Sequence, residues 1–346
     1  MPPSESTNKE RKKYKVILFG LGPIGASIAR LALERKETLK VIGAIDINPS
    51  LEGKDLGEVL GSGTNTGILV NKSGRSLYAD ADVVLHATTS FLNDAFPQLS
   101  EFCENGVDVV STCEELSYPW HSREKLASEL DAIAKKNNAT LLGTGVNPGF
   151  VMDALPITLS GACHSVSQVK VTRILDAEKR RLPFQKKVGI GLSVSEFEES
   201  VRTGRFGHIG LPESMAMVCS ALGIKVEKIE QKISPKVAVR ETLTSNFGRV
   251  PAGNVLGLVQ DGRAFGLGGK LLAEYHIEMY AGAQEPRDEI ELIAKPSNIM
   301  LKIPGGTPGD PATAALVVNS IDRVVEASPG LYTVRDLRPA TSVFSF

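Results

Sequence analysis

The feature that most constrains the fold is a glycine-rich turn between a buried strand and a helix. Residues 16–19 form an apolar, β-favouring run, typical of a strand buried on both faces of a parallel sheet. Gly20, Gly22 and Gly25 follow with the spacing GxGxxG, and helical spacing resumes at residue 26. The first glycine permits a tight turn, the second lets a pyrophosphate approach the backbone, and the third lets the helix pack closely on the strand. The segment therefore predicts a dinucleotide-binding βαβ unit with the pyrophosphate at the helix N-terminus.

A second apolar strand at residues 41–45 ends at Asp46, 21 residues after the last of these glycines. A carboxylate at this point is expected to meet the adenosine ribose, whereas an ordinary βαβ unit would use it only as a cap. No arginine follows to bind a 2′-phosphate, which favours NAD, but Asn48, Ser50 and Lys54 could hold a phosphate. NADP and NAD therefore both stay open as the cofactor. The predicted coenzyme-binding residues are Gly20, Leu21, Gly22, Pro23, Ile24, Gly25, Asp46, Asn48, Thr88, Thr89, Ser90 and Asn147.

Composition excludes several classes of function. The 346 residues include 39 Lys and Arg against 40 Asp and Glu, so charge-driven binding to nucleic acid or to a membrane surface is not expected. No apolar stretch approaches the roughly 20 residues needed to span a bilayer. Residues 1–13 are polar, lack a hydrophobic segment, and read as a disordered leader and not as a secretory signal. The four cysteines are scattered without a CxxC, as in reduced cytosolic proteins, so we expect a cytoplasmic location.

The chain length and a change of pattern predict two domains in an α/β fold. Residues 14–149 alternate strand and helix and predict a Rossmann dinucleotide-binding domain. Residues 150–309 predict an α+β domain with a mixed or antiparallel sheet, which binds substrate and mediates dimerisation. A helix over 312–327, with Asp310 as N-cap and Pro311 at its first position, is expected to bring residues 310–346 back onto the first domain. In the second domain we predict strands at 169–175, 237–244, 255–261, 271–281, 289–293 and 298–303, and helices at 193–203 and 211–222.

Polar residues follow the strands predicted at 82–87 and 107–112. Because ligands lie at the carboxyl edge of doubly wound sheets, residues 88–91 either flank the nicotinamide or simply cap a helix. Glu114 and Glu115 stand at the tip of the next strand, where a desolvated carboxylate can act as general acid or base. Acidic residues also commonly begin helices, so a capping role stays open for both. His86 lies within an apolar run and is expected to be a hydrogen-bonded core histidine.

Other chemistry-bearing motifs are missing. There is no Ser-His-Asp signature, phosphate-binding GKS/T loop or HExxH, and the five histidines are dispersed, so no metal site is expected. Asn147 precedes Pro148-Gly149 at the crossing into the second domain, and its amide could orient substrate or nicotinamide.

Six motifs occur in order along the chain and together carry a resemblance. They are the glycine turn at 20–25, STCEELSYP at 111–119, GTGVNPGF at 143–150, QKKVG at 185–189, GHIGLPES at 207–214 and GDPATA at 309–314. The set resembles the 2,4-diaminopentanoate dehydrogenase family and the related native amine dehydrogenases, whose fold is similar to that of dihydrodipicolinate reductase. The resemblance covers nearly the whole chain after about residue 14.

The resemblance implies reversible, NAD(P)-dependent conversion of an amine to a ketone or aldehyde plus ammonia. It places the catalytic glutamate on Glu114, with Glu115 as the fallback, and it implies a homodimer that often accepts NADPH. The chain lacks the adjacent histidines of classical dihydrodipicolinate reductase, which argues against that reaction itself.

The substrate pocket of such an enzyme is expected to be largely apolar. The residues predicted for its wall are Trp120, Phe150, Met152, Phe184 and Thr313, with Thr307 a weaker candidate. A rival possibility is an imine or amino-acid reductase on the same scaffold, which should bind a carboxylate through a cation. Arg173, Arg180, Arg181 and Lys187 are the candidates for that role. The sequence as a whole is also compatible with a nonenzymatic coenzyme sensor and with a carbonyl reductase that does not use ammonia.

Overall fold

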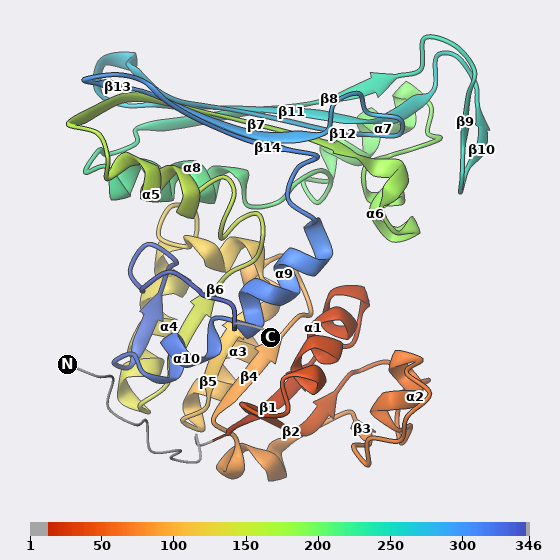
Figure 1. Cartoon of the computed structure of the whole chain (residues 1–346), viewed down its shortest axis with the longest axis vertical. Helices are drawn as coiled ribbons and strands as arrows, with labels where there is room; N and C mark the ends of the chain where they lie inside the picture. Colours follow the sequence, from red (N-terminus) through yellow and green to blue (C-terminus); the bar gives the residue numbers. More distant parts are fainter. Residues whose placement is uncertain (1–12, 344–346) are drawn as a thin grey trace, which may run out of the picture.

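The computed structural model describes residues 13–343, so the predicted leader lies, apart from Lys13, outside the described residues. Its lower half in Figure 1 is built on a seven-stranded parallel sheet in the order β15-β6-β5-β4-β1-β2-β3. The strands are β1 (Tyr14–Phe19), β2 (Leu39–Ile45), β3 (Val70–Asn71), β4 (Val83–His86), β5 (Asp108–Ser111), β6 (Thr140–Gly143) and β15 (Gly330–Tyr332).

Helices cover both faces of this sheet because its strands are apolar on both sides. On one face α1 (Pro23–Glu34) packs in one core with Val16 and Leu18 of β1; on the other face α3 (Leu92–Glu104) and α4 (Glu124–Lys136) pack against Ile17. The shorter elements are α2 (Leu56–Leu60) and the single-turn helices η1 (Arg75–Asp80) and η2 (Glu114–Ser117). This is the doubly wound arrangement that the sequence predicted.

The upper half in Figure 1 is a six-stranded mixed sheet in the order β14-β13-β7-β12-β11-β8. Only β7 and β12 run parallel; the other neighbours are antiparallel. Helices α5 and α8 lie between this sheet and the parallel sheet, and the opposite face is uncovered (Figure 1). The elements are α5 (Ala154–Ser160), β7 (Ser165–Asp176), η3 (Ala177–Lys179), α6 (Leu182–Lys187), α7 (Val194–Arg202), α8 (Leu211–Ala221), β8 (Lys228–Val237), β9 (Thr242–Thr244), β10 (Gly248–Val250), β11 (Val255–Phe265), η4 (Leu267–Gly269), β12 (Leu271–Tyr280), β13 (Arg287–Lys295) and β14 (Ile299–Pro304). The predicted fold class, a Rossmann domain followed by an α+β domain, is confirmed.

Two predicted elements were wrong in their bounds. The strand expected over 237–244 is the end of β8 followed by β9; most of β8 was missed because this edge strand is polar and largely exposed. The helix expected over 312–327 is two helices, α9 (Gly309–Val318) and α10 (Ile321–Val325). Pro308, and not Asp310, is the N-cap of α9; Asp310 lies in the first turn of this helix, and its carboxylate binds Arg180 and Arg181.

The chain returns to the parallel sheet after β14. Val317 and Val318 of α9 share a hydrophobic core with Ile28 of α1, and Gly330 of β15 pairs in parallel with Thr140 of β6. The chain thus crosses between the two sheets twice, once after β6 and once before α9.

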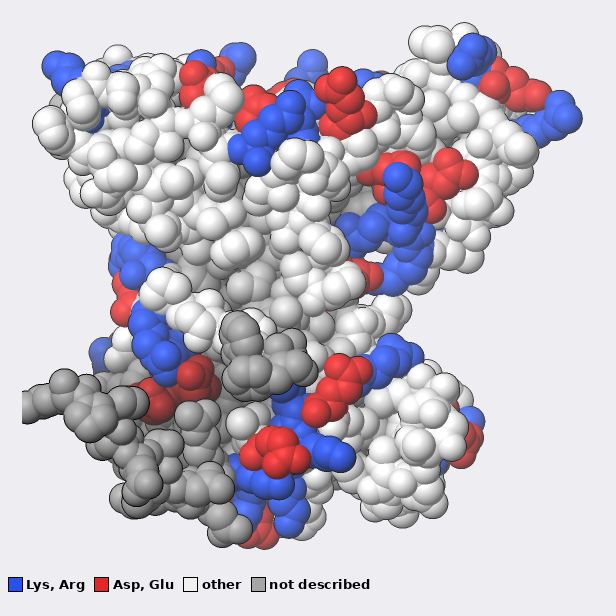
Figure 2. Space-filling model, viewed as in Figure 1, with Lys and Arg blue, Asp and Glu red and all other residues white. Residues whose placement is uncertain are grey.

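The surface agrees with the balanced composition. Figure 2 shows acidic and basic side chains interspersed over this face of the molecule, with a notch between its upper and lower halves. No helix within residues 13–343 is long and apolar enough to cross a bilayer. The four cysteines are free.

Candidate active site

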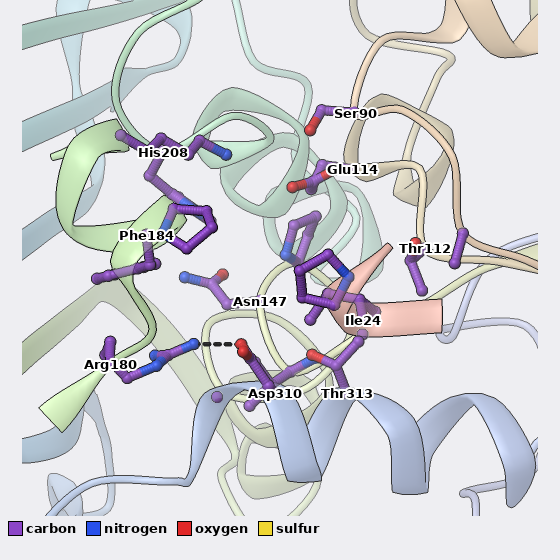
Figure 3. Close-up of a pocket in the computed structure, with 18 of the residues that line it drawn as sticks. Ile24, Ser90, Thr112, Glu114, Asn147, Arg180, Phe184, His208, Asp310 and Thr313 are labelled. Atoms are coloured by element: carbon purple, nitrogen blue, oxygen red, sulfur yellow. Dashed lines mark hydrogen bonds and ion pairs between the residues drawn. The ribbon is translucent and has the colours of Figure 1, made fainter. Parts of the chain in front are cut away.

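A cavity of about 390 Å³ lies between the two halves of the molecule, at the carboxyl ends of the parallel strands. Figure 3 shows its walls: Ile24, Thr112 and Glu114 come from the parallel-sheet half, Phe184 and His208 from the mixed-sheet half, and Thr313 from α9. The residues predicted for the coenzyme site, the acid–base role and the pocket wall that line it are Gly22, Pro23, Ile24, Thr88, Thr89, Ser90, Glu114, Asn147, Phe184 and Thr313.

The three glycines differ in what surrounds them. Gly20 has φ +91°, and a Cβ there would overlap the carbonyl oxygen of Ala87; a Cβ on Gly25 would overlap the carbonyl oxygen of Gly20. A Cβ on Gly22 would meet nothing within 4 Å, and this residue lines the cavity. The open space at Gly22, just before the N-terminus of α1, fits a pyrophosphate held by backbone N–H groups.

Asp46 lies outside the cavity lining, at the end of β2. Its carboxylate accepts hydrogen bonds from the backbone N–H groups of Leu21 (2.6 Å) and Asn48 (2.8 Å), so it ties the glycine turn to the loop after β2. Asn48 in turn accepts from the backbone and hydroxyl of Ser50 at 3.0 and 2.9 Å. The arrangement places a carboxylate beside the glycine turn, where an adenosine ribose would lie.

The adjacent glutamates on η2 have different surroundings. Glu115 is buried, and its carboxylate accepts from the backbone N–H of Leu92 at 2.7 Å and from Arg123 at 2.8 Å. Glu114 is the one that lines the cavity. Its side chain hydrogen bonds with Ser90; desolvation raises its pKa above the usual value, while the charge of Lys187 opposes the shift. Glu115 therefore has a structural role, and Glu114 has the position of an acid–base group.

The strand end before residue 88 holds the predicted core histidine. His86 is fully buried, its Nδ1 lies 2.8 Å from Ser111 Oγ and its Nε2 2.8 Å from Gln98 Oε1, and burial lowers its pKa to about 4. Thr88 also contacts this ring, at 2.9 Å. The prediction for His86 is thus confirmed.

Asn147 projects into the middle of the cavity (Figure 3). Its Nδ2 donates to Met152 Sδ at 2.8 Å, and its buried Oδ1 has no hydrogen-bond partner within residues 13–343. An unpartnered buried amide oxygen is available to accept from a ligand.

The mixed-sheet half contributes cationic side chains to the cavity. Most of them were predicted from the sequence only as possible ligands for the carboxylate of an amino-acid substrate. Arg180 and Arg181 line the cavity and bind Asp310, which joins the segment before α6 to the first turn of α9. Figure 3 shows the Arg180–Asp310 ion pair. Arg173 is buried and binds Asp288 and the Thr307 carbonyl. Lys187 and His208 also line the cavity. His208 was missed because a single histidine in a loop carries no local signal; the nearby Gly207 and Gly210 were the available hint.

Three of the residues predicted for the pocket wall do not line this cavity. Trp120 is 40% exposed, and neither it, Phe150 nor Met152 lines the cavity. Trp120 lies in the turn after η2, and Met152 is fully buried in the core below the mixed sheet, where Phe150 also packs. The lining of the cavity is mainly apolar, as expected, and its mixed-sheet wall also carries arginine, lysine and histidine.

The parallel sheet, the glycine turn and the cavity between the two halves define a two-domain dehydrogenase that binds NAD(P). Residues 14–113 match the family described as dihydrodipicolinate reductase, N-terminus, and residues 150–345 match the 2,4-diaminopentanoate dehydrogenase C-terminal domain. The chain belongs to the 2,4-diaminopentanoate dehydrogenase family.

Relatives support this assignment over the full length. The chain is 32% identical over 339 residues to 2,4-diaminopentanoate dehydrogenase of Acetoanaerobium sticklandii, covering 94% of each. It is 22% identical to an amine dehydrogenase of Streptomyces virginiae, covering 94% of this chain and 96% of the other. The solved amine dehydrogenase from Mycobacterium smegmatis matches with a TM-score of 0.83 and 26% identity, over 96% of this chain and 98% of that one. The WlbA dehydrogenase from Bordetella pertussis, solved with NADH, shares the fold alone (TM-score 0.53, 14% identity, 84% and 74% covered).

Proposed function

We propose that this protein catalyses the reversible NAD(P)-dependent oxidative deamination of an amine to a ketone or aldehyde and ammonia. The observation that carries the proposal is Glu114, a carboxylate with a raised pKa on the wall of a cavity that also contains the open Gly22. A desolvated carboxylate can exchange a proton with ammonium and can stabilise a cationic iminium. The names of the relatives point to the same chemistry.

In the direction of amination, the Glu114 carboxylate takes a proton from ammonium and holds the resulting ammonia by a hydrogen bond. Ammonia adds to the carbonyl carbon, and a proton moves from nitrogen to oxygen to give a carbinolamine. Glu114 then returns its proton to the hydroxyl, which leaves as water, and an iminium cation remains beside the Glu114 carboxylate. The coenzyme supplies the hydride that reduces this cation. The free Oδ1 of Asn147 accepts a hydrogen bond from the substrate or from the nicotinamide amide.

The finer features of the coenzyme site favour NAD(H). The Asp46 carboxylate at the end of β2 would repel a 2′-phosphate, and Asn48 beside it already binds the backbone and hydroxyl of Ser50. Replacing Asp46 with Ser should increase the NADPH-to-NADH ratio of kcat/KM. An unchanged ratio would show that Asp46 does not face the ribose.

The cations of the cavity favour a substrate that carries a carboxylate. Lys187 lines the exposed rim and makes no hydrogen bond or ion pair with the described part of the chain. Arg173 is buried, and its Nη1 has no hydrogen-bond partner in the same part of the chain. Both can donate to a carboxylate at the far end of an amine substrate, as in the substrate for which the relative from Acetoanaerobium sticklandii is named.

We also propose a homodimer. The face of the mixed sheet opposite α5 and α8 is uncovered in Figure 1, and a second copy could pair with it through a two-fold axis. A solution mass of about twice 37.0 kDa, measured by light scattering, would support it; a monomer mass would contradict it.

The test is reduction of small ketones with NADH or NADPH, with and without ammonium. Glu114→Gln should lose at least about 100-fold in kcat, the usual scale of a general acid–base group, and should still bind coenzyme. Glu114→Asp, which keeps the carboxylate on a shorter side chain, should retain more activity. Ketone reduction that needs no ammonium would favour a carbonyl reductase, and full activity of Glu114→Gln would remove Glu114 from the mechanism.

The carboxylate is tested with two amines that share a five-carbon chain, 4-aminopentanoate and pentan-2-amine, of which only the first carries it. The wild type should prefer 4-aminopentanoate in kcat/KM. Lys187→Met should reduce this preference about tenfold, which is the effect of losing one charge-assisted hydrogen bond. Equal turnover of both amines would exclude a carboxylate subsite.

A further inference from the structure

The loop of residues 207–210, between α7 and α8, packs directly on the proposed acid–base residue. Gly210 has φ +91°, and a Cβ there would lie 2.7 Å from Pro148 and 3.2 Å from the Cβ of Glu114. Only glycine allows this approach, because both the backbone conformation and the space exclude a side chain. The loop therefore brings His208 to the same cavity as Glu114, and Figure 3 shows the two on opposite sides of it.

The backbone of His208 is held in place by a buried side chain of the mixed sheet. Gln260 on β11 accepts from the His208 N–H at 2.9 Å and donates to the His208 carbonyl at 3.0 Å. Gln260 is 1% exposed, and Gly207, with φ +90°, lets the loop pass it, since a Cβ there would lie 3.0 Å from Gln260 Oε1. Because Gln260 binds both the N–H and the carbonyl of His208, the backbone that carries the imidazole is held in place.

One nitrogen of the imidazole is unpaired within the described part of the chain. Its Nε2 is buried and has no hydrogen-bond partner among the described residues, although the ring lines the cavity. Buried polar groups in folded proteins are nearly always paired, so an unpaired one in a ligand cavity indicates a contact with the ligand.

We propose that His208 is a second catalytic residue, whose Nε2–H donates a hydrogen bond to the oxygen of the carbonyl and of the carbinolamine. The proposal rests on the proposed function. Glu114 accepts hydrogen bonds from the nitrogen and moves the protons, whereas His208 stabilises the charge that develops on oxygen. When ammonia forms the C–N bond, the electron pair of the C=O π bond moves to the oxygen that Nε2–H holds. When water leaves, the C–O bond breaks and the nitrogen lone pair forms the C=N bond. His208 keeps its proton throughout, so the overall proton balance is that of Glu114.

The surroundings keep this imidazole neutral. Burial lowers the pKa of His208 to about 3, and the charges of Lys187 and Arg173 act in the same direction. At neutral pH the ring therefore donates as an imidazole and not as an imidazolium. Triosephosphate isomerase uses a neutral histidine in the same way to polarise a carbonyl.

The test separates the oxygen steps from hydride transfer. Hydride transfer from an amine forms the iminium before any oxygen is involved, and water addition and carbinolamine collapse follow. With NAD+ and 4-aminopentanoate (or pentan-2-amine, if the wild type prefers it), His208→Leu should form the first equivalent of NADH at the wild-type rate. Its steady-state turnover should fall by about 100-fold or more, the effect of removing one donor from a developing oxyanion.

Two further variants complete the test. His208→Gln, whose amide nitrogen can reach the position of Nε2, should recover part of the steady-state rate, and His164→Leu, at an exposed histidine outside the cavity, should match the wild type. Each variant should bind NADH with an unchanged Kd, which shows that it is folded. An equal loss in the first turnover and in the steady state, or no loss in His208→Leu, would overturn the role of His208. A wild type that deaminates neither amine would instead refute the proposed function.

Discussion

The adjacent glutamates of η2 give the sharpest prediction, because the structure assigns opposite properties to them. Glu115→Ala removes the acceptor of the Leu92 N–H, and Leu92 is fully buried, so a backbone donor is left unpaired. That loss costs about 1–3 kcal/mol. The ion pair with Arg123 adds about 1 kcal/mol or less, because the arginine side chain is 35% exposed. The free energy of unfolding should therefore fall by roughly 1–4 kcal/mol, and Tm by roughly 1–6 °C, because a chain of this length has a large unfolding entropy.

Glu114→Gln should have the opposite effect: it should abolish turnover without lowering the stability. The pKa of Glu114 is raised in the folded state, so folding binds its proton more tightly and the ionised carboxylate disfavours the fold at neutral pH. Removing that charge should leave Tm unchanged or slightly higher while kcat collapses.

The assay is thermal unfolding of the coenzyme-free protein at pH 7, followed by circular dichroism, alongside steady-state kinetics. Glu115→Gln is the intermediate control: it keeps an oxygen for the Leu92 N–H and loses only the ion pair, so its Tm should fall by no more than about 1–2 °C. A stable Glu115→Ala that binds coenzyme but no longer turns over would refute the assignment. So would a Glu114→Gln variant with a clearly lowered Tm.

Two further predictions concern pH and the glycine turn. The kcat/KM should fall as the pH drops through the raised pKa of Glu114, and Lys187→Met, which removes the cation that opposes this shift, should move the fall to higher pH. Lys186→Met, on the same helix but outside the cavity, should leave the pH profile of kcat/KM unchanged; a shift in both variants would argue for a general surface-charge effect. Gly22→Ala should keep the wild-type Tm but weaken coenzyme binding about tenfold (a loss of roughly 1.4 kcal/mol), measured by fluorescence titration. Gly25→Ala should instead lower the stability by about 1–3 kcal/mol, because its Cβ overlaps backbone; equal Tm values for the two variants would contradict this distinction.

The structural features that could be predicted from sequence are those set by residues close together in the chain. The turn at residues 20–25 is such a case, since strand, glycines and helix are consecutive in the chain. The roles of Glu114 and Glu115 could not be separated from the residues themselves, because the difference lies in Leu92 and Arg123, which only the tertiary fold brings to Glu115.

The mixed-sheet wall of the cavity was harder to predict for the same reason. His208 acquires its place from Gln260, 52 residues further along the chain. Trp120 was expected in the pocket because it is aromatic and follows the glutamates, but the turn after η2 directs it to the surface. The split of the C-terminal helix follows from Ser320, whose hydroxyl donates to the Leu316 carbonyl at the break and competes with the helical pattern.

The late return of the chain to the parallel sheet has a consequence for biosynthesis. Residues 144–329 separate β6 from its outer neighbour β15, so a ribosome needs roughly 10–40 s to deliver the strand that completes the sheet. During that time β6 presents an unpaired edge, and the apolar side of α1 lacks the cover of α9. The nascent protein is therefore most vulnerable to mispairing between copies just before its last helices emerge, and chaperones that shield strand edges should raise its yield most in that interval.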